Sequence, residues 1–292
     1  MEFENFTWAV IIGILIGFLT RLRMLRADYR QYPTYPHGQI IHLALGLIAS
    51  ALGAIAIPAL LQKDYTAITF LTVAAQQFRD VRNMERETLS KLDQMELVQR
   101  GATYIEGIAM VFEGRNYLVI FTAALTTFAA VISDRWWVGV ATGIFLLAIS
   151  GIVKSGKVLK DIARVKGGQL RVEGPSLYVD DIYLMNIGLA ANREIILQQG
   201  VGLIVEPVDI SAKVTISNIG QRQAILHDAS ISMGVYRDTG EPALIPISKR
   251  DLKSGRLGVL LLPNDQDLQK AIRVVSEVPV LESAVRKPAQ YP

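Results

Sequence analysis

The sequence predicts a multi-span α-helical membrane domain followed by a soluble domain of mixed α/β (α+β) structure. Three observations lead to this fold class. The chain is 51% hydrophobic and 20% charged, with a mean hydropathy of +0.31, whereas about 25% of the residues of a typical soluble domain are charged. The apolar excess lies before residue 155. Beyond that point short β-like runs alternate with amphipathic segments, as they do in soluble proteins.

The domain boundaries follow this change in composition. Residues 1–160 form the predicted transmembrane domain, with four or five helical spans, and residues 165–287 form the predicted soluble domain. Residues 288–292 are a short tail. Within the first domain a long, charged, amphipathic helix is predicted over about residues 65–100, because much of that stretch consists of good helix formers with few breakers.

Five apolar segments are candidate spans, at about residues 6–19, 39–61, 65–78, 117–132 and 138–153. The third is marginal for a span, because it is apolar for only about 13 residues before a dense run of charged residues begins at Arg79. It is therefore either a tilted, shielded span or a re-entrant segment. The second carries Gly46 and Gly53 on one face, and small residues there let helices pack closely and make a homo-oligomer reasonable.

Basic residues at the ends of the predicted spans indicate the topology. The first span is followed by Arg21, Arg23, Arg26 and Arg30, and the last by Lys154, Lys157 and Lys160. Because lysine and arginine mark the cytoplasmic side, we predict a multi-pass protein of the cytoplasmic membrane with a cytoplasmic C-terminal domain. This placement depends on an odd number of spans, and it reverses if the third segment is re-entrant.

The soluble domain is predicted to be a two-layer sandwich of strands and helices. Strands are expected near residues 169–173, 201–206, 211–217, 243–247 and 257–262, and helices near 183–199, 218–232 and 264–277. Mixed elements of these lengths favour a sheet covered by helices around one core.

The composition excludes several kinds of chemistry. The chain has no cysteine and only three histidines, which rules out thiolate nucleophiles and cysteine-based metal sites and leaves little for other metal chemistry. The phosphate-binding motifs GxxxxGK[ST] and GxGxxG and the zinc-peptidase motif HExxH are absent. We therefore predict no cofactor and no metal. Because no basic patch is interleaved with aromatic residues, we also predict no nucleic-acid partner.

Two glutamates stand out near the start of the fourth apolar segment. Residues Tyr104–Ala109 spell YIEGIA, and Glu106 and Glu113 lie seven residues apart, on about one face of a helix. Carboxylates at membrane depth must face protein, water or a cation, which makes them candidates for function. At the headgroup level they would only cap the helix. The basic residues that could pair with them are Arg79, Arg82, Arg86 and Arg115.

Other candidate site residues are considered as partners of Glu106 and Glu113. Asp80 with Glu106 or Glu113 could supply the carboxylates of a membrane peptidase. His42 could relay protons or bind a metal with Glu106, although a lone histidine near a helix end more often lies at the interface. Tyr104, His42 and the arginines Arg79, Arg82 and Arg86 are therefore candidate binding residues.

Two charged groups of the soluble domain are open to two interpretations. Asp180–Asp181 could bind a divalent cation, and Lys249–Arg250 with Lys253 could meet a phosphate. Paired charges on loops are more often plain surface residues.

The hexapeptide at Tyr104–Ala109 resembles the motif for which the YIEGIA protein family of spore-forming Firmicutes is named. The length, the early apolar segments and the soluble C-terminal half are also similar to that family. The resemblance implies a membrane protein linked to sporulation, and it singles out no residues beyond the hexapeptide.

Three hypotheses for the function follow. The leading one is a sporulation-associated integral membrane protein that acts as an anchor, scaffold or regulator through a cytoplasmic domain that binds a protein partner. The alternative is a membrane-embedded peptidase, and a transporter or channel subunit is the third. A non-enzymatic role is favoured, because no complete catalytic motif is present.

Overall fold

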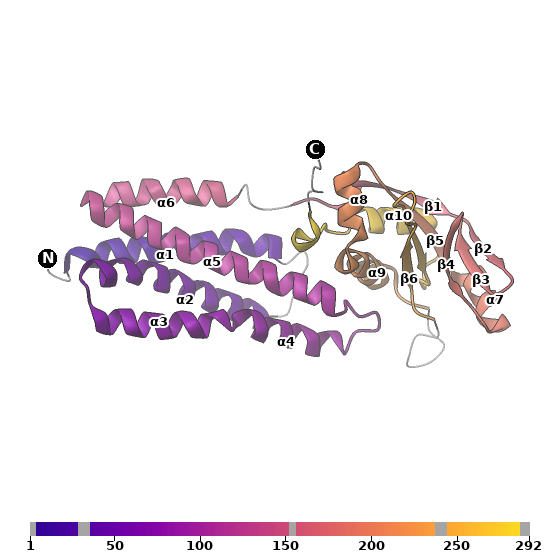
Figure 1. Ribbon diagram of the computed structural model, residues 1–292, viewed down its shortest axis with the longest axis horizontal. Helices are drawn as coiled ribbons and strands as arrows, with labels where there is room; N and C mark the ends of the chain where they lie inside the picture. Colours follow the sequence, from indigo (N-terminus) through magenta and orange to yellow (C-terminus); the bar gives the residue numbers. More distant parts are fainter. Residues whose placement is uncertain (1–3, 29–35, 152–155, 237–243, 287–292) are drawn as a thin grey trace. The chain divides into compact units, whose positions relative to one another are not determined.

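The computed structural model describes residues 4–28, 36–151, 156–236 and 244–286. They form two compact units (Figure 1). The helical unit consists of Met1–Arg86 and Ile108–Ser155, and the C-terminal unit consists of Glu87–Gly107 and Gly156–Pro292. The predicted tail, residues 288–292, and the end of the last predicted span lie outside the described residues.

The described residues up to 151 contain six helices: α1 (Glu4–Asp28), α2 (Pro36–Leu61), α3 (Tyr65–Arg79), α4 (Val81–Asp93), α5 (Ala102–Ser133) and α6 (Trp136–Ser150). Among the described residues, three stretches are long and apolar enough to cross a membrane, namely Phe6–Leu25, Gly38–Leu61 and Ala102–Ser133. Helix α6 is apolar but shorter, and the third predicted span corresponds to the 15-residue α3. Fewer than the predicted four or five spans therefore meet this criterion.

Small residues allow the long helices of the helical unit to approach closely. A Cβ atom on Gly17 would lie 2.7 Å from the Ser50 side chain of α2 and 2.9 Å from that of Ala123 of α5. A Cβ atom on Gly53 would lie 2.2 Å from the carbonyl oxygen of Ile120. The small face predicted for α2 is therefore used for packing within this chain.

The predicted helix over residues 65–100 is interrupted. It consists of α3 and α4, which meet at Asp80, and α4 ends at Asp93. The Asp93 carboxylate accepts hydrogen bonds from the backbone N–H groups of Arg100 (2.7 Å) and Gly101 (3.0 Å) and so closes a turn. Gly101 has φ = 78°, a conformation that favours glycine. Helix α5 begins directly after this turn.

The C-terminal unit contains two antiparallel sheets. The larger has the strand order β1-β5-β7-β6, with β1 (Ala163–Gly168), β5 (Val201–Pro207), β6 (Ile247–Arg250) and β7 (Leu257–Leu261). The smaller is a meander of β2 (Leu170–Glu173), β3 (Ser176–Val179) and β4 (Ile182–Asn186). The helices of this unit are α7 (Ala190–Gln199), α8 (Ile210–Ser217), α9 (Ile219–Met233) and α10 (Leu268–Ser276), with short 3₁₀ helices η1 (Leu159–Asp161) and η2 (Glu282–Ala284).

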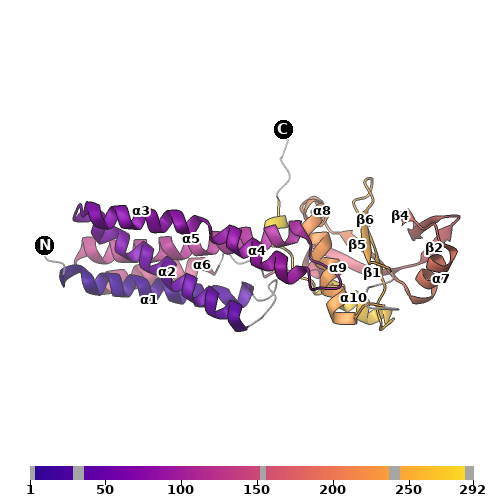
Figure 2. The ribbon, with the colours of Figure 1, turned by 90° about the horizontal axis from the view of Figure 1, so that it is seen from below.

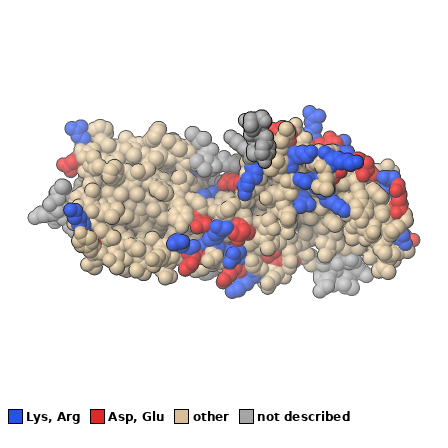
Figure 3. All heavy atoms as spheres, in the orientation of Figure 1, with Lys and Arg blue, Asp and Glu red and all other residues tan. Residues whose placement is uncertain are grey.

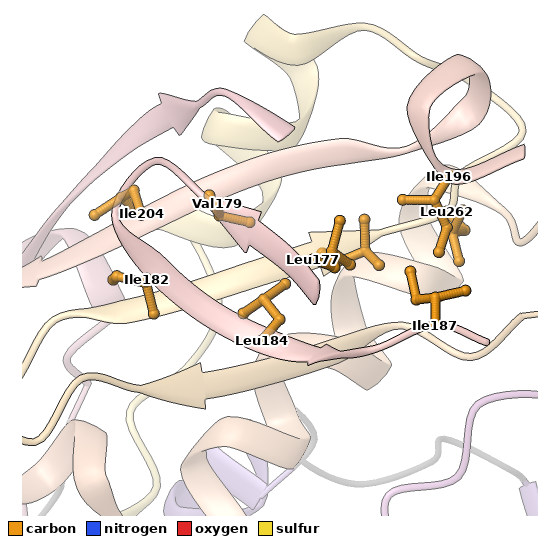
Figure 4. Packing of buried hydrophobic residues seen from close by; sticks show 9 residues of the cluster. Leu177, Val179, Ile182, Leu184, Ile187, Ile196, Ile204 and Leu262 are labelled. Carbon is orange, nitrogen blue, oxygen red and sulfur yellow. The ribbon is translucent and has the colours of Figure 1, made fainter. Parts of the chain in front are cut away.

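These elements form three layers. Helices α8, α9 and α10 lie against one face of the larger sheet, and the smaller sheet covers its other face (Figures 1 and 2). Figure 4 shows the core between the two sheets, to which Leu177 and Val179 of β3 and Ile204 of β5 contribute. Strand β5 is buried from Val201 to Val205 because both of its faces are covered.

Several predicted elements of the soluble domain differ from the structure. Residues predicted as a strand near 211–217 form α8, whose first turn is capped by the Asp209 carboxylate accepting from the Ala212 N–H at 2.6 Å. The predicted helix near 183–199 begins as β4 and becomes helical only at Ala190. Strands β1 and β4 were not predicted. Strand β1 is stabilised by pairing with the distant strand β5, whereas β4 pairs with β3 across the short turn at Asp180–Asp181, within residues that were predicted to be helical. The beginning of the strand predicted near 243–247 falls outside the described residues.

The core between the sheets leads to a test of stability. Leu177 is fully buried, so Leu177→Ala should lower the free energy of unfolding of the C-terminal unit by ~2 to 5 kcal/mol. Leu252 is 78% exposed, and Leu252→Ala should change it by less than ~0.5 kcal/mol. Hydrogen exchange of the β3, β5 and β7 amides in the purified full chain measures both values. Equal protection in the two variants would contradict the assigned core.

Candidate functional site

The YIEGIA hexapeptide forms the first turns of α5 and is built into the C-terminal unit through Gly107. The Tyr104 side chain is only 1% exposed, and its ring lies edge-on to the His227 ring of α9, with centroids 6.4 Å apart. The Tyr104 backbone N–H donates to the side-chain oxygen of Gln223 at 3.3 Å. This bond satisfies one of the N–H groups that the start of a helix leaves unpaired. The hexapeptide therefore holds α5 to α9.

Glycines allow this close contact. A Cβ atom on Gly107 would lie 2.4 Å from the hydroxyl oxygen of Ser283 in η2, and one on Gly220 of α9 would lie 3.1 Å from the Thr103 carbonyl oxygen. Real Cβ atoms do not approach that closely without a shift of the neighbour. The glycine of the hexapeptide is thus a packing residue.

Buried polar groups fix the turn before α5 to the same helix. His227 Nδ1 lies 2.6 Å from the carbonyl oxygen of Val98, so Nδ1 carries the proton and donates it. Burial lowers the pKa of His227, and the imidazole is neutral at pH 7. The Arg100 guanidinium lies 3.7 Å from the Glu96 carboxylate and 4.0 Å from that of Asp93.

Asp228 is the acid of α9 next to His227. Burial raises its pKa to about 7, and the positive charge of Arg100 opposes this shift without cancelling it. A carboxyl with a pKa near 7 changes its charge in the physiological range. Asp228 is therefore the group most sensitive to pH among the polar residues described here for α9 and the turn before α5.

A second cluster of polar residues lies inside the helical unit. Arg21 of α1 is fully buried, with its guanidinium carbon 4.8 Å from the centre of the Phe112 ring of α5. The His42 ring of α2 lies 4.7 Å from the same ring, and His42 Nε2 lies 3.9 Å from Oε1 of Glu85 of α4. Burial raises the pKa of Glu85 to about 7, and the charge of Arg21 opposes the shift.

This cluster combines side chains from four helices. Gly46 of α2 provides the space for Arg21, because a Cβ atom there would lie 2.4 Å from Arg21 Cγ. Asn116, one turn beyond Phe112, is fully buried, and neither amide atom has a hydrogen-bond partner among the described residues. Buried ionisable groups are expensive unless they are paired. An imidazole beside a carboxyl of near-neutral pKa is an arrangement suited to proton exchange.

The residues predicted from sequence are only partly brought together. Glu113 pairs with Arg82 at 3.3 Å, and both side chains are partly exposed. Glu106 is also partly exposed and belongs to the C-terminal unit, whereas Glu113 belongs to the helical unit. Three of the candidate residues are exposed around the end of α3 and on α4, namely Arg79, Asp80 and Arg86. No group of three His, Asp or Glu side chains in the described part of the chain is arranged to hold a metal ion.

Sequence reasoning missed Arg21, Glu85 and Asn116 of the helical unit and the polar residues of α9. The sequence held a signal for Glu85, because it lies four residues from both Val81 and Leu89 and therefore on the same face of the helix. In the structure all three residues are buried. Arg21 continues the spacing of Gly13 and Gly17, which marks the packed face of α1. The polar face of α9 gives no such signal, because its partners come from distant segments.

A family model described as "YIEGIA protein" matches residues 9–291. The chain belongs to the YIEGIA family. A relative from Bacillus subtilis (strain 168), named "Uncharacterized protein YphB", is 55% identical over 289 residues, which cover 99% of this chain and 97% of the relative. No solved structure matches the chain. The family match extends over both units, so the YIEGIA fold comprises the apolar helices as well as the two sheets.

The tight contact at Gly107 leads to a test with a matched control on the same helix. Gly107→Ala should weaken the protection of α9 amides against hydrogen exchange, because the new Cβ would meet the Ser283 hydroxyl. Gly114→Ala has open space within 4 Å and should stabilise α5 by ~1 kcal/mol through helix propensity alone. Adding Ser283→Gly should restore protection to Gly107→Ala. If the two alanine variants behave alike, the packing role of Gly107 is wrong.

Asp228 predicts a specific dependence of stability on pH. Its pKa in the folded chain, about 7, lies above the value of 3.8 for a free aspartate, so folding favours the protonated form. The free energy of unfolding of the C-terminal unit should therefore fall as the pH rises from about 4 to about 7. Asp228→Asn should remove this slope and raise stability at pH 8. Asp265→Asn, which breaks an exposed ion pair with Lys270, should leave the slope unchanged.

Proposed function

We propose that this YIEGIA protein is a multi-pass protein of the cytoplasmic membrane that acts as a scaffold or regulator in sporulation. In this proposal α1, α2 and α5 span the bilayer, and the C-terminal unit is a cytoplasmic domain that binds a protein partner. The apolar stretches of these helices and their exposed side chains, such as Leu15, Leu47 and Phe121, support contact with lipid. The proposed link to sporulation comes from the resemblance of the hexapeptide to the motif of a family of spore-forming Firmicutes.

The observation that carries the proposal is the division of α5 between the two units. Residues Ala102–Gly107 complete the C-terminal unit, and the following residues of the same candidate span belong to the helical unit. A domain tethered only to concentrate an enzyme at the membrane needs a linker, not a shared helix. The shared helix supports a role in which a partner of the domain and the membrane helices influence each other.

An open cavity of 570 Å³ in the C-terminal unit supports partner binding. It lies between the end of β4 and the segment leading into β6, and its lining has no charged residue. Leu189 and Ile245 at this cavity are 68% and 70% exposed. Strands β4 and β6 each pair on one side only among the described strands, so an extended apolar segment of a partner can add to an edge there.

The absence of cysteine from the chain makes the topology directly testable. Single cysteines placed at Asp134, in the turn between α5 and α6, and at Leu252, after β6, can be labelled in intact cells with an impermeant maleimide. We expect Asp134→Cys to react from outside and Leu252→Cys to react only after the membrane is opened. The reverse pattern would place the C-terminal unit outside. Release of the protein by alkaline carbonate would contradict membrane insertion altogether.

The sporulation role predicts a loss of heat-resistant spores in a deletion strain of a Bacillus that carries this gene. Complementation with wild type or Glu106→Gln should restore the spore yield equally, because a scaffold does not need a titrating group at position 106. Gly107→Val should fail to restore it, because the hexapeptide then no longer fits against η2. Blotting confirms equal protein levels. A deletion strain with normal spore yield would refute the link to sporulation.

A membrane peptidase is a second candidate, and one observation favours it. Glu85 and His42 form the buried acid–imidazole pair described above, whereas Glu106, Glu113 and Asp80 are not gathered into one site by any described contact. If the chain cleaves a peptide bond through this pair, Glu85→Gln should reduce turnover by roughly 10²-fold or more at an unchanged protein level. Full activity in Glu85→Gln would rule out this mechanism.

A further inference from the structure

Lysines and arginines gather on one face of the C-terminal unit (Figure 3). The sequence singled out Lys249, Arg250 and Lys253 as residues that could meet a phosphate. The fold adds Arg222, because α9 packs against β6, the strand that carries Lys249 and Arg250. It also adds Lys213 of α8, whose Nζ donates to the Lys253 carbonyl oxygen at 3.3 Å.

Arg222 and Arg250 lie near each other, and neither has an acidic partner among the described residues. Arg222 is partly buried, and its Nε atom is shielded from solvent and has no hydrogen-bond partner among the described residues. Burial and the charge of Arg250 lower the pKa of Arg222. Neither arginine forms an ion pair in the described part of the chain. Bringing together two cations and burying a donor both cost free energy unless an anion joins them.

The carboxylates of Asp251 and Asp181 already have other hydrogen-bond or ion-pair partners. The Asp251 carboxylate accepts hydrogen bonds from the Ser254 N–H at 2.9 Å and from the Ser254 hydroxyl at 2.5 Å. These bonds hold the pKa of Asp251 down to about 2, and they shape the turn that follows β6. Asp181 pairs with Arg256 at 2.5 Å. Neither carboxylate therefore neutralises Arg222 or Arg250.

The turn after β6 is itself well defined. Gly255 has φ = 78°, and a Cβ atom there would lie 2.3 Å from Cε of Lys213. The Lys213 chain therefore lies along the backbone of the turn and fixes the carbonyl of Lys253. A charged face with an ordered backbone loses little entropy when it binds an anion.

We propose that Arg222 and Arg250 form a binding site for a phosphate group, with Lys249 and Lys253 contributing positive charge at its edge. Guanidinium groups bind phosphate oxygens through paired, charge-assisted hydrogen bonds. A dianionic phosphate balances the two arginines better than a single carboxylate does. The site goes beyond partner binding, since it makes the C-terminal unit responsive to a phosphorylated ligand or lipid headgroup.

The test uses the purified full chain in a zwitterionic detergent at constant ionic strength. Inorganic phosphate and dihexanoyl phosphatidic acid, a soluble lipid with the same phosphate group, are titrated against chloride while binding is followed by calorimetry and by the melting temperature. Arg222→Gln and Arg250→Gln should each weaken binding roughly tenfold or more. Arg273→Gln, which removes an exposed arginine of α10, is the matched control and should bind as wild type.

The variants also have an expected effect without ligand. Arg250→Gln should raise the melting temperature in chloride buffer, because it removes the repulsion from Arg222, whereas a merely structural arginine would lower it when lost. Binding of both probes supports a site for the phosphate group itself, and binding of the lipid alone supports the same site with a headgroup as its source. Failure of both probes, or equal binding by wild type and both arginine variants, overturns the proposal.

Discussion

The packing of the first turns of α5 against α9 is the interaction on which the C-terminal unit depends. Helix α9 carries buried or partly buried polar side chains that bind the backbone of other segments. Gln223 accepts from the Tyr104 N–H, His227 donates to the Val98 carbonyl, and Gln221 bonds the backbone of both Pro279 and Leu281. Helix α9 thus joins two segments, residues 98–104 and 279–281, that are distant from it and from each other in sequence. Each of these groups would be costly if its partner were lost.

This arrangement explains why the family's hexapeptide has its composition. The tyrosine fills the space beside His227, the isoleucines and alanine are buried, and the glycine admits Ser283. Only Glu106 retains substantial exposure. Most of the hexapeptide is therefore explained by packing, and the glutamate is the position at which a function beyond packing can be sought.

The interior of the helical unit differs from the polar contacts of α9, because only a few charged side chains lie there among many apolar ones. Arg21 and His42 stack on Phe112, and Glu85 provides the acid beside His42. Gly46 makes room for the arginine where any side chain would collide with it. Such a cluster costs desolvation energy, and its buried charges are therefore candidates for a role in specificity or chemistry. Its position on four different helices ties the unit together.

Three features could be predicted from the amino-acid sequence: the division into apolar helices and a mixed C-terminal region, the buried strands β5 and β7, and the importance of residues 104–109. Hydropathy, the spacing of apolar residues and a short motif are all local properties of the chain. The tertiary structure was needed to assign residues 87–107 to the C-terminal unit and residues 211–217 to a helix. It also brought Glu85 to His42 and Arg222 to Arg250. These outcomes depend on long-range pairing, burial and charge, which no local pattern of residues encodes.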